Sequence, residues 1–149
     1  MGAWGTGIFE NDFACDWALE IDEGGPGDVF AKTFSEVTES LEEANFIAGN
    51  TAERSLAALL TLVEIAEGVT PTAVLISVDE EDDIVLPESL KVSGQQLQDL
   101  IAQGIGAVTP IIADPDKCES YELWFEEEDR DEWKAGVEDL LGRARILFT

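Results

Sequence analysis

Hydrophobic residues recur along most of this chain at the three- and four-residue spacing of helices that bury one face. The spacing predicts helices within residues 11–21, 28–43, 50–68, 93–112, 114–125 and 129–145. The apolar stripes that define these helices are Phe13, Trp17 and Ile21; Phe30, Phe34, Val37 and Leu41; Leu56, Leu59, Leu60, Val63 and Ala66; Leu97, Leu100, Ile101, Ile105, Val108, Ile111 and Ile112; Cys118, Tyr121, Trp124 and Phe125; and Trp133, Val137, Leu140, Leu141 and Ala144. Leu62 and Ile65 widen the third stripe, which predicts that the third helix is the central one.

Residues that typically begin or end helices stand at the boundaries of these segments. The candidate N-caps are Asn11 or Asp12, Asp28, and Asp114 followed by Pro115. The candidate capping boxes are Asn50 with Glu53, Ser93 with Gln96, and Asp129 with Glu132. Breaks are expected at residues 24–27 and at Gly68, and Pro110 is expected to kink or end its helix.

The stretch between the third and fourth predicted helices has a different pattern. Residues 73–78 are apolar and rich in β-branched side chains, and residues 84–86 are apolar as well. Five consecutive carboxylates, Asp79–Asp83, separate the two runs and make a poor tight turn. Residues 73–86 are therefore expected to form either a short hairpin or a loop with extended ends.

The length of the chain, 149 residues, suits a single hydrophobic core. With 45% hydrophobic residues, the chain has the apolar material to bury about 70% of its unfolded surface, as domains of this size do. We therefore predict one all-α domain over residues 1–149, a bundle of five or six helices in which the segment 73–86 is the extended part.

The net charge of the chain argues against some classes of binding partner. It has 33 Asp and Glu against 8 Lys and Arg, which is a net charge of −25. Direct binding to nucleic acid needs cations that displace counterions from phosphates, and docking on anionic membranes needs basic residues too. The charge argues against both partners and favours a basic protein instead.

Histidine is absent from the sequence. Its absence removes Ser-His-Asp and Cys-His catalysis and histidine-ligated metal sites. No motif selects an acid–base pair from the 33 carboxylates, and the N-terminal glycines do not form a dinucleotide fingerprint. We therefore expect no catalytic residues, no cofactor and no enzymatic activity.

Two acidic runs form the candidate interaction surface: Asp79, Glu80, Glu81, Asp82 and Asp83, and Glu126, Glu127 and Glu128. Neither run has the ligand spacing or the turn glycine of an EF-hand, so we expect no metal site there. A solvated acidic face is the simplest interpretation of both runs. The second predicted helix carries charged residues on its other face as well, at Lys32, Glu36, Glu39 and Glu43.

The two cysteines, Cys15 and Cys118, are far apart in the sequence and lack a third thiol or a C-x-x-C pair. This count fits neither a zinc site nor a disulfide framework. We expect two buried, reduced thiols, with a single bridge between them as the alternative. No stretch approaches the ~18 apolar residues of a membrane span, and no signal peptide is recognisable, so we expect a cytoplasmic protein.

The opening residues carry a resemblance to a known family. The segment MGAWGTGIFEND, followed by Ala14, Asp16 and Trp17, resembles the start of the bacterial DUF4259 proteins. Their pattern is close to M-G-x-W-G-x-G-x-F-[DE]-N-D-x-x-x-D-W. The closing stretch is similar as well, at Glu119, Leu123, Trp124, Trp133, Val137, Leu140 and Leu141. The resemblance implies a family without an assigned biochemical function, so no catalytic residue carries over.

Two functions remain after these exclusions. The first is a non-catalytic regulatory module whose acidic face engages a basic protein, such as a toxin or a nucleic-acid enzyme. The alternative is a helical domain that binds a small ligand in a pocket near Trp4, Trp17 and Trp124.

Overall fold

The computed structural model describes residues 7–9, 11–21, 24–77, 86–114, 117–119 and 127–148. Within these ranges the chain forms six α-helices and one 3₁₀ turn, and it contains no strand. The elements are α1 (Asp12–Leu19), α2 (Asp28–Ala44), α3 (Gly49–Glu67), α4 (Thr72–Ser77), the 3₁₀ turn η1 (Glu88–Leu90), α5 (Gly94–Ala113) and α7 (Glu127–Leu147). The predicted all-α bundle is confirmed.

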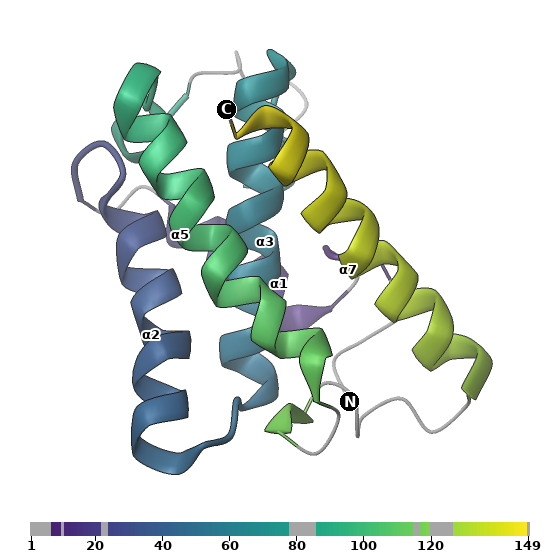
Figure 1. Cartoon of the computed structure of the whole chain (residues 1–149). Helices are drawn as coiled ribbons and strands as arrows, with labels where there is room; N and C mark the ends of the chain where they lie inside the picture. The colour runs from purple at the N-terminus through teal and green to yellow at the C-terminus, as the bar shows by residue number, and fades with distance from the viewer. Residues whose placement is uncertain are drawn as a thin grey trace.

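Helix α3 is the centre of the bundle. It packs against α1, α2, α4, α5 and α7, and Figure 1 shows it between the other long helices. Its side chains at Leu56, Ala57, Leu59, Leu62 and Val63 are all fully buried. A helix that is apolar on several sides must be surrounded by others, so the prediction that the third helix is central is confirmed.

The buried face of α1 differs slightly from the predicted stripe. Its core residues are Ala14, Trp17, Ala18 and Ile21, and the Trp17 ring lies 6.1 Å from the Phe30 ring, centroid to centroid. Phe13, expected in the stripe, is 39% exposed. The small residues Ala14 and Ala18 bring α1 close to the bundle, and this turns Phe13 to the flank of the helix.

The predicted caps of the first two helices have different outcomes. Asn11 is the N-cap of α1, and its Oδ1 accepts a hydrogen bond from the backbone N–H of Ala14 at 2.9 Å. Asp28 is instead the first residue of α2, after an N-cap at Gly27 with φ 85°. The Asp28 carboxylate accepts from the N–H of Gly25 at 2.9 Å and so closes the preceding turn.

The predicted capping box at Asn50 is wrong. Helix α3 begins one residue earlier, and the Asn50 side chain accepts from the adjacent N–H of Thr51. The N–H of Gly49 donates to Glu119 Oε1 at 2.9 Å. A carboxylate from a distant segment therefore satisfies the start of α3, in place of a local cap.

The other two predicted capping boxes are also wrong. Ser93 is the N-cap of α5 but makes no side-chain capping bond, and the Gln96 side-chain amide donates to the Pro26 carbonyl at 2.9 Å. Asp129 lies inside α7, two residues after its start. Both patterns lie near the start of a helix. The Gln96 side chain has a different partner, however, and Asp129 lies inside its helix instead of capping it.

The predicted extended segment is corrected in its first part. Residues 72–77 form α4, with Ala73 and Val74 buried, and residues 78–85 lie outside the described part of the chain. Pro71 starts this turn, since the N–H groups of Val74 and Leu75 both donate to its carbonyl. Contact with α1 and α3 overrides the β-propensity of this short run.

Helix α5 continues through Pro110 to Ala113. A Cβ atom added at Gly104 would meet side chains of Leu59 and Phe34 at 2.8 Å, so this glycine lets α5 lie directly against α2 and α3. Asp114 is the C-cap of α5, and its carbonyl accepts from the N–H of Lys117 at 3.1 Å. The rest of the predicted helix 114–125 lies outside the described residues except for Lys117–Glu119, where Cys118 forms an isolated parallel bridge with Ile47.

The last helix follows its predicted pattern. Trp133, Val137, Leu140, Leu141 and Ala144 are all buried along α7. Both cysteines are free thiols; Cys118 is buried as expected, whereas Cys15 is half-buried and donates to the Phe9 carbonyl. None of the described helices combines the length and the apolar character needed to cross a bilayer.

Candidate functional site

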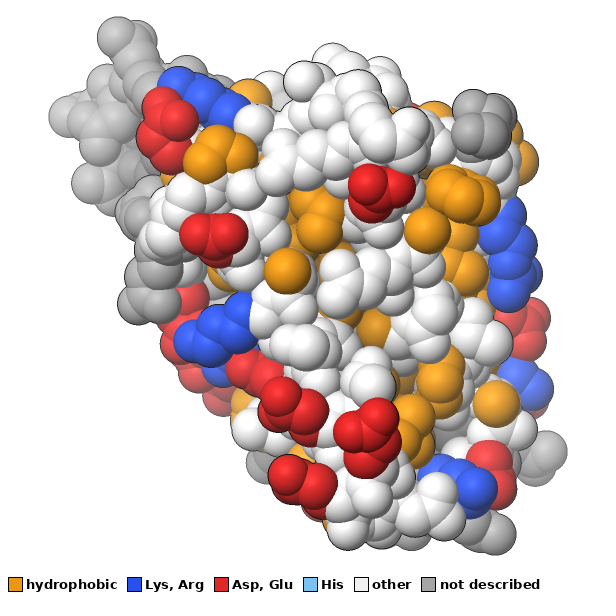
Figure 2. Space-filling model, turned by 60° about the vertical axis from the view of Figure 1, so that its left-hand side comes forward, with side chains coloured by type: hydrophobic (Ala, Val, Ile, Leu, Met, Phe, Trp, Pro, Cys, Tyr) orange, Lys and Arg blue, Asp and Glu red, His pale blue; other side chains and the backbone are white. Residues whose placement is uncertain are grey.

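The strongest candidate for an interaction surface is the outer side of α2. This helix buries Phe30, Phe34 and Val37 against the bundle. The opposite side of its C-terminal half therefore carries the acidic residues, which are Glu36, Glu39, Glu42 and Glu43. We call these four residues the α2 acidic face. Figure 2 shows acidic side chains gathered in the lower part of the molecular face on which α2 lies.

The carboxylates of the α2 acidic face repel one another and the end of their own helix. Glu36 and Glu39, and Glu39 and Glu42, are three residues apart, and Glu39 and Glu43 are four apart. Like charges at these spacings destabilise a helix by about 0.2–0.5 kcal/mol per pair. The last turn of α2, where the helix dipole is negative, carries no basic residue.

Lys32 is the one basic residue of α2; it lies four residues before Glu36, and no described ion pair joins it to the α2 acidic face. Four of the eight basic side chains pair with carboxylates elsewhere: Arg54 with Glu20, Lys91 with Glu88, Lys134 with Glu138 and Arg143 with Glu67. No described ion pair involves a residue of the α2 acidic face. Glu39, Glu42 and Glu43 lie toward the negative end of the helix without a described ion pair, and this is a local electrostatic cost that a cationic partner would lower.

The two acidic runs singled out in the sequence are placed only in part. Residues 79–83 and Glu126 lie outside the described residues, and the side chain of Glu127 is not described either. Glu128 is exposed at the start of α7. Among the described residues, no group of three or more Cys, Asp or Glu side chains is arranged to hold a metal ion. The role of the two runs as an interaction surface stays a prediction.

Trp17 belongs to the core. Its side chain is fully buried, and its indole Nε1–H donates to Thr33 Oγ1 at 3.0 Å. The Thr33 hydroxyl in turn donates to the Val29 carbonyl at 2.7 Å, so both polar groups are satisfied inside the bundle. Trp4 and Trp124 lie outside the described residues. A pocket bounded by all three tryptophans stays a prediction.

The asparagine of the opening motif has a structural role. Asn11 is only 7% exposed, and its amide donates to the Ile8 carbonyl at 3.2 Å and to Glu53 Oε2 at 3.4 Å. Glu53 lies on α3 and is buried. Together with the cap on Ala14, these bonds attach the opening segment to the central helix.

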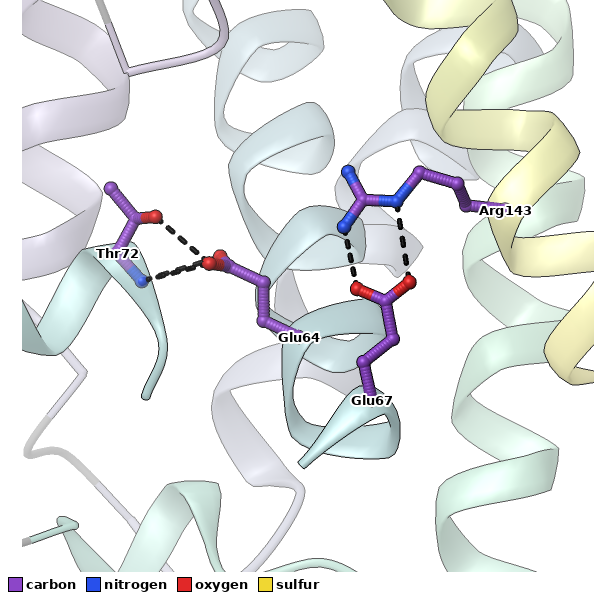
Figure 3. A network of polar contacts seen from close by, with 4 residues as sticks. All are labelled: Glu64, Glu67, Thr72 and Arg143. Atoms are coloured by element: carbon purple, nitrogen blue, oxygen red, sulfur yellow. Dashed lines mark hydrogen bonds and ion pairs between the residues drawn. The ribbon is translucent and has the colours of Figure 1, made fainter. Parts of the chain in front are cut away.

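A contrasting acidic cluster lies at the C-terminal end of α3, where every carboxylate has a partner (Figure 3). Glu64 is buried and accepts from the Thr72 N–H at 3.2 Å and from its hydroxyl at 2.9 Å. Glu67 accepts from Arg143 Nη2 at 2.6 Å and from its Nε at 3.5 Å. The hydrogen bond to Glu67 raises the pKa of Arg143. The cluster joins α4 and α7 to α3.

The half-buried thiol of Cys15 is poorly suited to nucleophilic chemistry. Burial raises its pKa, and the neighbouring carboxylates Asp12 and Asp16 raise it further. The thiolate is the reactive form of cysteine, so this environment keeps the side chain protonated and unreactive near neutral pH.

One known family matches most of the chain. The family described as "Domain of unknown function (DUF4259)" matches residues 2–136. This chain belongs to the DUF4259 family. The match begins in the opening motif and ends within α7, so it includes the α2 acidic face and the whole of α3. Neither a curated protein nor a solved structure matches the chain.

Proposed function

We propose that this DUF4259 protein is a non-catalytic regulatory module that binds a basic protein, with the α2 acidic face as the contact. The observation that carries the proposal is the group of four carboxylates without a described counter-ion at the negative end of α2. A basic side chain placed there would remove repulsion that the folded protein otherwise retains.

The net charge supports the same partner. At −25 the chain attracts cationic proteins from a distance and raises the rate of encounter. The local carboxylates then select the orientation of the complex. Binding of this kind weakens as salt screens the charges, with a Debye length of about 8 Å at physiological ionic strength.

The chemistry of the chain supports a role without catalysis. The sequence has no histidine, and the environment of Cys15 raises the pKa of its thiol. Both cysteines are free thiols, which is the state favoured by the reducing cytoplasm where we propose that the protein acts.

The test is a quantitative co-purification from the cells that naturally make the protein. Tagged wild type is compared with a variant in which the four carboxylates become amides: Glu36→Gln, Glu39→Gln, Glu42→Gln and Glu43→Gln. We expect the wild type to enrich a basic protein. The amount of that protein recovered with the variant should be at least about tenfold lower, since each charged contact contributes about 1 kcal/mol or more.

A matched control removes the same number of charges elsewhere on the exposed surface. Its substitutions are Asp12→Asn, Asp99→Asn, Asp131→Asn and Asp139→Asn. We expect this control to retain the partner, with only the modest loss due to a lower net charge. Equal loss in both variants would place the effect in the overall charge and contradict the assignment to α2. Enrichment of no basic protein by the wild type would contradict the proposed function itself.

A further inference from the structure

A groove between α5 and α7 has a composition unlike the rest of this acidic surface. It has a volume of about 480 Å³ and is lined by Thr109, Ile112 and Ala113 of α5 and by Lys134, Glu138, Leu141 and Arg145 of α7. Leu141 is buried at its floor, and Ile112 is half-buried beside it.

The charges along the groove are unequal at its two ends. Lys134 Nζ lies 3.9 Å from Glu138 Oε1, so this end has both signs of charge. Arg145, in the last turn of α7, is exposed, and no described carboxylate pairs with it. In a chain with 8 basic residues and a net charge of −25, an unpaired guanidinium beside an apolar floor is a local exception.

The dimensions favour a small ligand over a docked helix. Lys134 and Arg145 are eleven residues apart on α7, which is about 16 Å along the axis. On the α5 side the lining spans only Thr109–Ala113, little more than one turn. A docked helix needs apolar contacts over at least two turns of both walls, whereas ligand pockets typically have volumes of about 300–1,000 Å³.

We propose that the α5/α7 groove binds a small amphipathic anion, an unbranched carboxylate of medium chain length. Its apolar chain lies on Ile112 and Leu141, and its carboxylate accepts hydrogen bonds from the Arg145 guanidinium. At the opposite end Lys134 is already paired with Glu138, so the cation at Arg145, without a described carboxylate partner, sets the orientation of the ligand. The groove is separate from the α2 acidic face, so this proposal is independent of the proposed basic partner.

The test measures the binding of decanoate and decanol, two ligands with the same chain length, by calorimetry below their aggregation limits. We expect decanoate to bind more tightly than decanol, because the alcohol lacks the charged contact. Arg145→Gln should weaken decanoate binding about tenfold and leave decanol unchanged. Thr109→Trp, an exposed position that fills the groove without removing a core side chain, should weaken both ligands.

The matched control is Lys91→Gln. Lys91 is exposed, pairs with Glu88 and does not line the groove, yet its loss changes the net charge as much as that of Arg145. We expect less than about a twofold effect from this control. NMR shift changes on adding decanoate should centre on Thr109, Ala113 and Leu141. The proposal would be overturned by equal affinity for the two ligands, or by equal effects of Arg145→Gln and Lys91→Gln. It would also be overturned if decanoate did not bind and the groove instead formed a dimer that Thr109→Trp dissociates.

Discussion

The C-terminal ends of α2 and α3 are both rich in carboxylates, but only one of them is neutralised. At the end of α3, Glu64 is bound by Thr72, and Glu67 is bound by Arg143. At the end of α2, no described cation pairs with Glu36, Glu39, Glu42 or Glu43. The difference follows from position, because α3 is central and every side of it faces another helix, whereas the outer side of α2 faces solvent.

The contrast suggests how the basic residues are used in this protein. Arg54 and Arg143 each join two helices through a carboxylate, at Glu20 and Glu67. Ion pairs that join elements are partly shielded from water and contribute more than exposed pairs. With 8 basic residues against 33 acidic ones, most carboxylates must remain without a partner. Carboxylate variants at the two ends should therefore change stability in opposite directions.

The largest effect is expected from Glu64→Ala at the end of α3. The Thr72 N–H and hydroxyl would both lose their acceptor in a site where Glu64 is 9% exposed. Unsatisfied donors of this kind cost about 1–3 kcal/mol, so the free energy of unfolding should fall by about 2 kcal/mol in urea titrations. The control is Glu36→Ala on α2, which removes a repelled charge and should raise the free energy of unfolding slightly, by less than about 0.5 kcal/mol. Equal losses would mean that the two ends do not differ.

A smaller loss is expected from Arg143→Met, which keeps the apolar stem and removes the bond to Glu67. The two side chains are 37% and 33% exposed, so screening by water limits the pair to about 0.5–1 kcal/mol. A double-mutant cycle with Glu67→Gln isolates this coupling. Arg145→Met, which removes a cation without a described carboxylate partner, should cost only a few tenths of a kcal/mol, about 0.3. A coupling near zero would mean that the pair of Arg143 and Glu67 does not stabilise the end of α3.

The opposite sign is expected from Glu43→Lys at the end of α2. A lysine there lies four residues after Glu39, a favourable spacing, and in the last turn, where the helix dipole favours a cation. We expect the free energy of unfolding to rise by about 0.5 kcal/mol, and the thermal midpoint to depend less on salt than in the wild type. Glu43→Gln should give about half of the gain. Destabilisation by the lysine would show that the α2 acidic face is not under repulsion.

The smallest effect concerns the carboxylates of α1, with Cys15 as the reporter. Burial, Asp12 and Asp16 raise the pKa of this thiol, so alkylation by iodoacetamide should reach half of its maximal rate at a higher pH than in an unstructured peptide. Asp16→Asn should shift that midpoint downward. A pKa raised by folding contributes stability below the unfolded value, and this contribution is lost as the pH rises through the folded value. Buried Cys118 is the internal control and should react only on unfolding; an unchanged midpoint in Asp16→Asn would remove that carboxylate as a cause.

The candidate site was visible in the sequence only as a pattern. The spacing of Glu36, Glu39 and Glu43 already placed them on the polar side of a helix. The pattern did not assign Glu42 to that side, because this residue lies at its margin. The lack of a counter-charge could not be predicted, since any of the basic residues could have reached α2 in another arrangement of the helices.

The sequence by itself determined five of the six described helices, their order, the central position of α3 and the membership of the family. Each of these depends on local spacing, such as the repeat of Leu56, Leu59 and Val63 or the opening motif. Only the tertiary structure decided where the polar groups found partners. Gly49 is bound by Glu119, Gln96 by Pro26 and Thr72 by Glu64, and none of these pairs is a local capping box. The physical reason is that apolar periodicity is encoded by neighbours in the chain, whereas a hydrogen bond forms with whichever group the fold brings within about 3 Å.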